Sequence, residues 1–240
     1  MTGVVETRDR PRVGAMRVAQ AALLSAWAGL FWFLFFSGQS WLYVGARTAW
    51  VVPTGGVVLS FAALGRWLSV RTTRREPVTA ARSWALGLIA LPVVVVMAFP
   101  PSSLGSYAAD RRSAALGFSA SGDASEGEIT LVDLGAALWS EETAAALAGR
   151  AGNEVSFIGF VTRRDGMPAD EFLLTRFIVS CCVADALSVQ VRVVNAPAGR
   201  FEQDQWVEVD GAFYPLGDEM VVDAARVRAV ERPERPYLNV

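Results

Sequence analysis

Two adjacent cysteines, Cys181 and Cys182, are the residues of this 240-residue chain best suited to chemistry, and Asp185 follows three positions later. They are the only cysteines in the sequence, and they interrupt the strand-forming stretch Phe172–Val194. Successive side chains of a strand point to opposite faces, so the two thiols can share one site only if the chain turns there. We expect that turn in Val183–Ala186.

Three interpretations of the thiols remain open. Buried cysteines behave as small hydrophobic residues, so one or both could belong to a core. In an oxidising compartment the neighbours could form a strained, readily reduced disulfide. Alternatively, Cys181, Cys182 and the Asp185 carboxylate could bind a soft ion, Zn²⁺ or Cu(I). Further carboxylates that could serve as ligands are Asp165, Asp170 and Glu171. Without histidine such a zinc site would be open, or completed by another chain.

The sequence contains no histidine, and all 22 of its basic residues are arginine. This removes the most common general base, and no nucleophile–base pair, phosphate loop or carboxylate dyad replaces it. We therefore predict that the protein is not an enzyme and has no catalytic residues. Arg176 lies in an otherwise apolar strand, so we expect it on the solvent face or paired with an acid such as Asp185. Arg176 and Asp165 are the supporting residues of the predicted site.

Residues 128–240 have the pattern of a small all-β domain. The predicted strands are Glu154–Thr162, Phe172–Ser180, Leu187–Val194, Trp206–Phe213 and Met220–Val230. One flanking helix is predicted over Gly135–Arg150, with an N-cap at Ser140. Five strands without intervening helices fit a five-stranded barrel that is closed or half-closed, and the order suggests an OB-fold. An up-and-down sandwich is the alternative.

The first 101 residues resemble a membrane domain in composition. The whole chain is 52% hydrophobic with a mean hydropathy of +0.33, which is too apolar for an ordinary soluble protein. Three transmembrane helices are predicted, at about 18–37, 48–68 and 83–100, and the pair Gly55–Gly56 offers a smooth surface for a neighbouring helix. Arginines cluster before the first helix and between the second and third. The positive-inside bias therefore predicts a multi-pass protein of the cytoplasmic (inner) membrane, with a cytoplasmic N-terminus and an extracytoplasmic C-terminal domain.

Charge divides the chain in the same way. Residues 1–101 carry 10 arginines and 3 acids, whereas residues 102–240 carry 12 arginines and 21 acids. A C-terminal domain with this negative balance would repel phosphates, so we do not expect it to bind nucleic acid. Between the two parts, residues 102–127 are rich in serine, alanine and glycine and are predicted to form a flexible linker, with one ordered turn around 110–112.

Several short sequence segments together resemble those of the YcgQ-like family of bacterial membrane proteins. They are a Ser-Leu-Gly after a proline pair, FIGFV, LTRFIVSCCVADA, WVEVDGAF and a terminal Pro-Tyr. The most specific of them is RFIVSCCVADA, residues 176–186. The family is described as an accessory subunit of a permease whose larger partner is a multispanning YcgR-like protein.

The resemblance implies an accessory subunit in transport, with that permease and the lipid bilayer as its partners, and it supplies no substrate. We expect the extracytoplasmic barrel to bind a ligand or partner near the Cys-Cys-x-x-Asp sequence. The alternative is a stand-alone extracytoplasmic metal-binding or thiol-redox protein, and an envelope scaffold is a third reading.

Overall fold

The computed structural model describes residues 13–69, 80–99, 102–111, 127–137, 140–216 and 219–238. The chain divides into two compact units. The helical unit comprises residues 1–40 and 50–101, and the barrel unit comprises Trp41–Ala49 and Ser102–Val240. The short segment Trp41–Ala49, which we call the 41–49 loop, therefore belongs with the barrel although it lies between two helices of the other unit in sequence.

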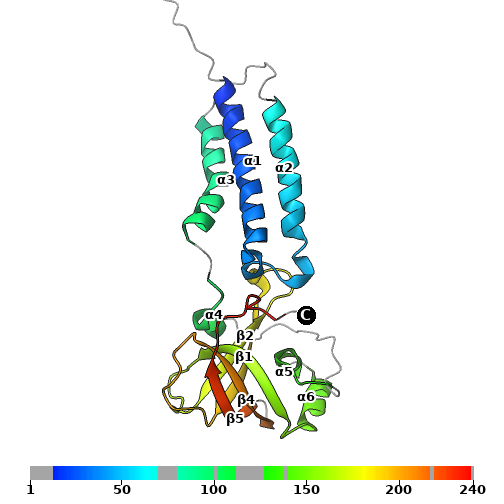
Figure 1. Ribbon diagram of the computed structural model, residues 1–240, viewed down its shortest axis with the longest axis vertical. Helices are drawn as coiled ribbons and strands as arrows, with labels where there is room; N and C mark the ends of the chain where they lie inside the picture. Colours follow the sequence, from blue (N-terminus) through cyan, green and yellow to red (C-terminus); the bar gives the residue numbers. More distant parts are fainter. Residues whose placement is uncertain are drawn as a thin grey trace, which may run out of the picture. The chain divides into compact units, whose positions relative to one another are not determined.

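The described part of the helical unit contains the helices α1 (Val13–Phe36), α2 (Val51–Ser69) and α3 (Ala80–Ala98), which lie side by side in Figure 1. Helices α1 and α2 pack closely at the glycine pair. A Cβ added to Gly55 would lie 2.5 Å from the Phe31 ring, and one added to Gly56 would lie 3.1 Å from the Trp32 ring. The smooth surface predicted at Gly55–Gly56 is thus occupied by α1.

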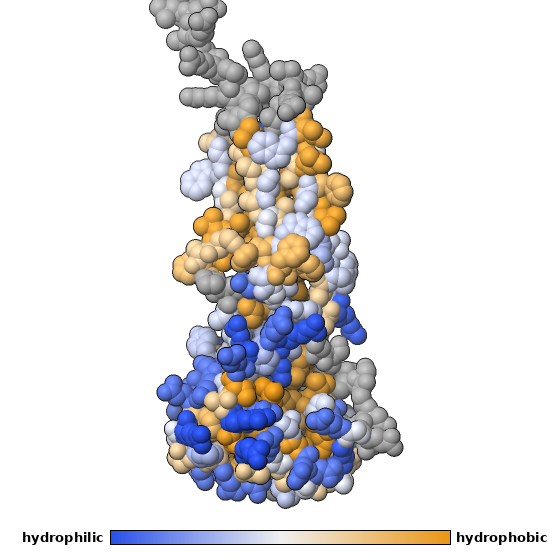
Figure 2. Space-filling view, in the orientation of Figure 1, coloured by the Kyte–Doolittle hydropathy of each residue, from blue (hydrophilic) through white to orange (hydrophobic). Residues whose placement is uncertain are grey.

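Among the residues that the structure describes, two segments are long and apolar enough to cross a membrane, Met16–Phe36 and Ala46–Ser69. Only 17% of the most apolar window of each is buried, in contrast to the core helix of a soluble protein. The apolar part of the third helix, Ser83–Ala98, is shorter. Hydrophobic residues cover much of the surface of the helices in Figure 2, and the side chains of Phe61 and Trp84 are largely exposed. Length and composition therefore support two of the three predicted membrane helices.

The barrel unit contains a closed five-stranded barrel. Its strands are β1 (Glu154–Thr162), β2 (Phe172–Ile178), β3 (Leu187–Val194), β4 (Trp206–Leu216) and β5 (Glu219–Ala229). The order around the barrel is β1-β2-β3-β5-β4, and β1 pairs with β4 to close it. All neighbouring strands are antiparallel except β3 and β5, which are parallel. The predicted five-stranded barrel is confirmed, and the parallel pair excludes the up-and-down alternative.

Two short helices cover the barrel where one was predicted. Helix α6 (Glu141–Ala148) begins at the predicted N-cap, because the Ser140 Oγ accepts a hydrogen bond from the Thr143 N–H at 3.2 Å. The apolar stretch before it forms a separate helix, α5 (Leu131–Ala137). Thr130 and Asp133 exchange hydrogen bonds between side chain and backbone there, which is a capping box that starts a helix. The prediction of one continuous helix over Gly135–Arg150 was therefore wrong.

The start of the predicted linker is folded against the barrel. Helix α4 (Ser106–Arg111) packs on β1 and β2, and Ala109 is only 2% exposed. The helix begins where the Ser106 N–H donates to the Asp204 carboxylate at 2.6 Å. Residues 102–111 are thus part of the barrel unit, while residues 112–126 lie outside the described residues.

The residues after β5, here called the C-terminal tail (230–238), return to strand β2. The Leu238 N–H donates to the Phe177 carbonyl at 2.8 Å, and the Leu238 carbonyl accepts from the Val179 N–H at 3.3 Å. Tyr237 is 6% exposed and packs in a second cluster with Phe160 and Phe177, outside the main barrel core. The tail therefore covers the outer face of the strand that leads to the two cysteines.

Candidate functional site

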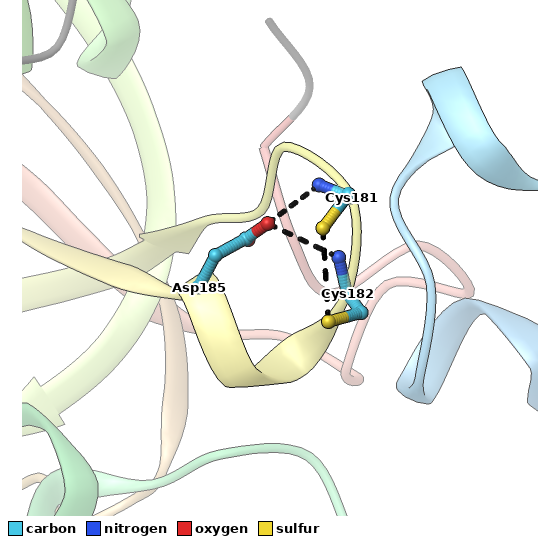
Figure 3. A group of neighbouring side chains, drawn as sticks. All are labelled: Cys181, Cys182 and Asp185. Carbon is cyan, nitrogen blue, oxygen red and sulfur yellow. Dashed lines mark hydrogen bonds between the residues drawn. The ribbon is translucent and has the colours of Figure 1, made fainter.

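The segment from Cys181 to Asp185, here called the thiol turn, follows β2 and ends in a single 3₁₀ turn, Val183–Asp185. The predicted bend of the chain is therefore present. Cys182 is extended (φ −154°, ψ 165°), and the chain turns directly after it. The two Sγ atoms consequently face each other, 3.7 Å apart (Figure 3). Cys181 is exposed and Cys182 is half-buried, so neither thiol is a core residue.

The Asp185 carboxylate holds this turn together. Its Oδ2 accepts from the backbone N–H groups of Cys181 at 2.8 Å and Cys182 at 3.3 Å, as Figure 3 shows. Its Oδ1 accepts from the Ser180 N–H at 3.0 Å. Because one carboxylate gathers three successive donors, the chain curls around it and both cysteines are fixed next to the acid.

The same contacts set the charge states of the turn. The pKa of Cys181 is raised to about 11, mainly because its thiol hydrogen-bonds to Asp185 and to Cys182. Burial raises the pKa of Asp185, but hydrogen bonds from the Cys181 thiol and from the three backbone N–H groups outweigh it and lower that pKa overall. At neutral pH Asp185 is therefore an anion and Cys181 a protonated thiol. Reactive redox cysteines have a lowered pKa instead, so Cys181 is a poor nucleophile.

The 41–49 loop holds the thiol turn from the other side. The Gly45 N–H and the Thr48 hydroxyl both donate to the Cys181 carbonyl, the former at 3.1 Å, and the Val183 N–H donates to the Tyr43 carbonyl at 2.9 Å. Val44 and Cys182 form an isolated antiparallel bridge. Both cysteines are thus fixed through their backbones by a segment more than 130 residues earlier in the sequence.

Arg176 occupies a position different from both of those predicted. Its guanidinium is half-buried and donates to the carbonyls of Pro236 at 3.1 Å, Arg235 at 2.9 Å and Ile158 at 3.3 Å. Burial lowers its pKa. The residue therefore neither faces solvent freely nor pairs with Asp185. It ties the C-terminal tail to β2 through the carbonyls of Pro236 and Arg235, and these carbonyls satisfy the donors of a half-buried guanidinium.

The other predicted carboxylates lie away from the thiols. Asp165 and Asp170 are exposed in the turn between β1 and β2, at the opposite end of β2 from Cys181. Glu171 forms an ion pair with Arg192, with an Nη2–Oε2 distance of 2.6 Å. The structure brings together Cys181, Cys182 and Asp185, and leaves the further candidate ligands outside.

The residues that sequence reasoning missed are those of the 41–49 loop. The one sequence feature that indicates this contact is Gly45. A Cβ added there would lie 2.7 Å from the Val179 carbonyl oxygen and 2.9 Å from the Ser180 carbonyl oxygen. A glycine between two apolar helices indicates close backbone approach only once the approaching segment is known. Periodicity carries no information about that partner.

Comparison with known families identifies the C-terminal part of the chain. Residues 118–239 match the family described as the DUF1980 C-terminal domain. The match covers just over half of the chain and includes every barrel strand and the thiol turn. No curated protein and no solved structure matches the chain.

Proposed function

The chain belongs to the family of the DUF1980 C-terminal domain, and from this premise we propose that it is an accessory membrane subunit whose barrel binds a ligand at the thiol turn. Its proposed partner is a multispanning permease of the YcgR-like kind. Proteins with this domain are typically membrane-associated bacterial proteins. The strand order with its parallel β3–β5 pair supports an OB-like fold for the barrel.

We place α1, α2 and α3 across the cytoplasmic membrane, with the N-terminus inside and the barrel unit outside. The excess of arginine over acids in residues 1–101 supports this orientation. The exposed apolar side chains of α3, such as Trp84 and Leu88, support its insertion as well, because such a surface requires lipid or a partner helix to cover it. The same helices would contact the permease.

One observation carries the accessory role: the 41–49 loop belongs to the barrel unit and holds the thiol turn. In sequence this loop connects α1 directly to α2. A ligand that moves the Cys181 backbone changes hydrogen bonds made by Gly45 and Thr48. Ligand binding outside the membrane is therefore linked, through the loop that connects them, to the two proposed membrane helices α1 and α2. A binding domain on a flexible tether would lack such a link.

Co-purification tests the proposal. The full chain, tagged at its N-terminus, is extracted from its native membrane in a mild detergent, and recovered proteins are identified by mass spectrometry. We expect one multispanning protein in fixed ratio to the chain. Recovery of a stable monomer with no such partner would contradict the accessory role.

The exposure of Cys181 supports a second candidate, a stand-alone extracytoplasmic metal-binding protein. It predicts metal binding with no partner recovered in the same purification. A stand-alone thiol-redox role is less well supported, because the pKa of Cys181 is raised rather than lowered.

A further inference from the structure

The thiol turn holds three potential metal ligands in one place. One ligand atom from each of Cys181, Cys182 and Asp185 lies within 4.8 Å of the other two. Within the described ranges this is the one group of three or more such side chains so close together. The ligand types combine two soft thiols with one hard carboxylate, which suits an ion of intermediate softness.

The spacing of the two sulfurs is the spacing that a tetrahedral ion requires. Two thiolates about 2.3 Å from a zinc ion, at a tetrahedral angle, lie roughly 3.75 Å apart. The Sγ–Sγ distance is 3.7 Å. A linear two-thiolate site of the kind that Cu(I) forms would separate the sulfurs by about 4.6 Å at the same bond length, and a disulfide would bring them to about 2.05 Å. The sulfurs therefore have the separation of two tetrahedral ligands.

The Asp185 carboxylate can be a ligand without releasing the turn. Its Oδ2 accepts two backbone N–H groups, whereas Oδ1 accepts one. Each carboxylate oxygen has about two acceptor positions, so one remains on Oδ1.

From this geometry we propose that the thiol turn is an open tetrahedral Zn²⁺ site, with Cys181 Sγ, Cys182 Sγ and an Asp185 oxygen as its three protein ligands. The proposal rests on the proposed ligand-binding role of the turn and names the ligand. On binding, two S–H bonds break and two S–Zn bonds form. Two protons pass to solvent, and no electrons are transferred.

The fourth position defines what kind of zinc site this is. Structural zinc sites are closed by four protein ligands, usually cysteine and histidine. This chain has no histidine and no third cysteine, and Cys181 is exposed. Water, or a donor atom from the partner, completes the coordination, so the ion is exchangeable. The 41–49 loop fixes the Cys181 carbonyl by hydrogen bonds. In other metal sites, hydrogen bonds to the ligand residues orient the ligands in the same way.

Cobalt substitution tests the site. The full-length protein is purified in mild detergent, reduced and stripped of metal, and then titrated with Co²⁺ without oxygen. We expect one Co²⁺ per chain, a thiolate-to-metal charge-transfer band in the near ultraviolet, and the intense visible bands of a tetrahedral ion. Zn²⁺ should displace the cobalt. Weak octahedral bands without charge transfer would overturn the proposal, as would uptake of Cu(I) by a protein that takes neither Co²⁺ nor Zn²⁺.

Matched variants assign the ligands. Cys181→Ser and Cys182→Ser should each weaken Zn²⁺ binding by about a hundredfold or more, and Asp185→Asn by about tenfold. Asp165→Asn, at the other end of β2, should bind as the unaltered protein does. Serine is a good N-cap, so Cys182→Ser retains the turn that begins at residue 182. Undiminished zinc affinity in the Cys181→Ser, Cys182→Ser double variant would refute the site.

A result that overturns the zinc site can be distinguished from one that overturns the accessory role. Recovery of the multispanning partner without Zn²⁺ or Co²⁺ binding would overturn the zinc site and leave the accessory role standing. One bound Zn²⁺ per chain without a recovered partner would support the zinc site and contradict the accessory role.

Discussion

Strand β2 has an acidic turn at each end, and the two turns differ in what the acid does. Before the strand, Asp165 is exposed in a turn that reverses the chain at Gly166, whose φ is 84°. After the strand, Asp185 accepts three backbone N–H groups and a thiol proton. Both turns contain carboxylates near the end of a strand.

The difference lies in the contacts around each acid. The turn at Gly166 is typical of a hairpin, in which glycine supplies the conformation and the acid keeps the turn in water. The thiol turn is hydrogen-bonded to the 41–49 loop, and the C-terminal tail pairs with the residues just before it, Phe177 and Val179. These two segments lie far apart in the sequence. The candidate site thus lies where segments distant in sequence fix the conformation of a short turn. A change in either segment should alter the thiol turn and leave the hairpin turn at Gly166 intact.

The largest effect is expected from Gly45→Val. Gly45 has an ordinary φ of −75°, so glycine is required there by contact and not by conformation. Its Cβ would lie 2.7 Å from the Val179 carbonyl oxygen, and the loop would have to leave the thiol turn, at a cost of about 3 kcal/mol. Hydrogen exchange should show loss of protection at the amides of residues 45 and 183.

Gly166→Ala is the matched control for that change. It places a side chain at a positive φ, which costs about 1 kcal/mol, and we expect lower stability with unchanged protection of the amides at 45 and 183. Equal loss of protection in the two variants would show that the thiol turn is not separately supported.

Thiol reactivity gives the next largest effect. With a pKa of about 11, Cys181 is mostly protonated below that pH, so its alkylation rate should rise about tenfold per pH unit from pH 7 to 9 without a plateau. Asp185→Asn removes the charge that stabilises the protonated thiol, which lowers the pKa and should accelerate alkylation at pH 8 by about tenfold or more. Tandem mass spectrometry of the protein with both cysteines present distinguishes alkylation at Cys181 from alkylation at Cys182, and it retains the Cys182 hydrogen bond that contributes to the raised pKa. A plateau near pH 9 in the unsubstituted Asp185 background would contradict the raised pKa.

Removing each acid compares the two turns directly. Asp185→Ala leaves three backbone N–H groups without their acceptor, and we expect a loss of about 1–2 kcal/mol in the free energy of unfolding. Asp165→Ala should change that free energy by less than about 0.5 kcal/mol, because the residue is exposed. Thermal unfolding followed by near-ultraviolet circular dichroism measures both. A loss for Asp165→Ala as large as that for Asp185→Ala would remove the distinction between the turns.

The barrel itself was largely predictable from the sequence. The bounds of β1 and β3 are those predicted, because alternating apolar residues mark a strand with one buried face. The turn at Val183–Ala186 was predictable too, since adjacent thiols can share a site only where the strand ends. The convergence of Cys181, Cys182 and Asp185 followed from local spacing alone.

The supports of the site were not predictable in the same way. Arg176 was expected at the surface or near Asp185, yet two of its three carbonyl partners lie about 60 residues later in the sequence. Gly45 contacts Cys181 although two predicted membrane helices and the linker lie between them in the sequence. Hydrophobic periodicity reports which face of an element is buried, and it does not report which distant backbone lies against that face.

Tyr237→Phe gives the smallest effect and examines the support from the C-terminal tail. The Tyr237 hydroxyl accepts from the Leu104 N–H at 3.2 Å and donates to the Leu42 carbonyl at 3.4 Å, so it links the tail to the start of the 41–49 loop. Removing one buried hydroxyl while retaining the ring should cost about 1 kcal/mol. Tyr107→Phe is the control, because Tyr107 is 73% exposed. If the tail supports the site, Tyr237→Phe should also raise amide exchange at Gly45 slightly while leaving the hairpin turn unchanged. A stability loss spread equally over both turns would mean that the hydroxyl stabilises the barrel as a whole, and that the thiol turn depends on the 41–49 loop alone.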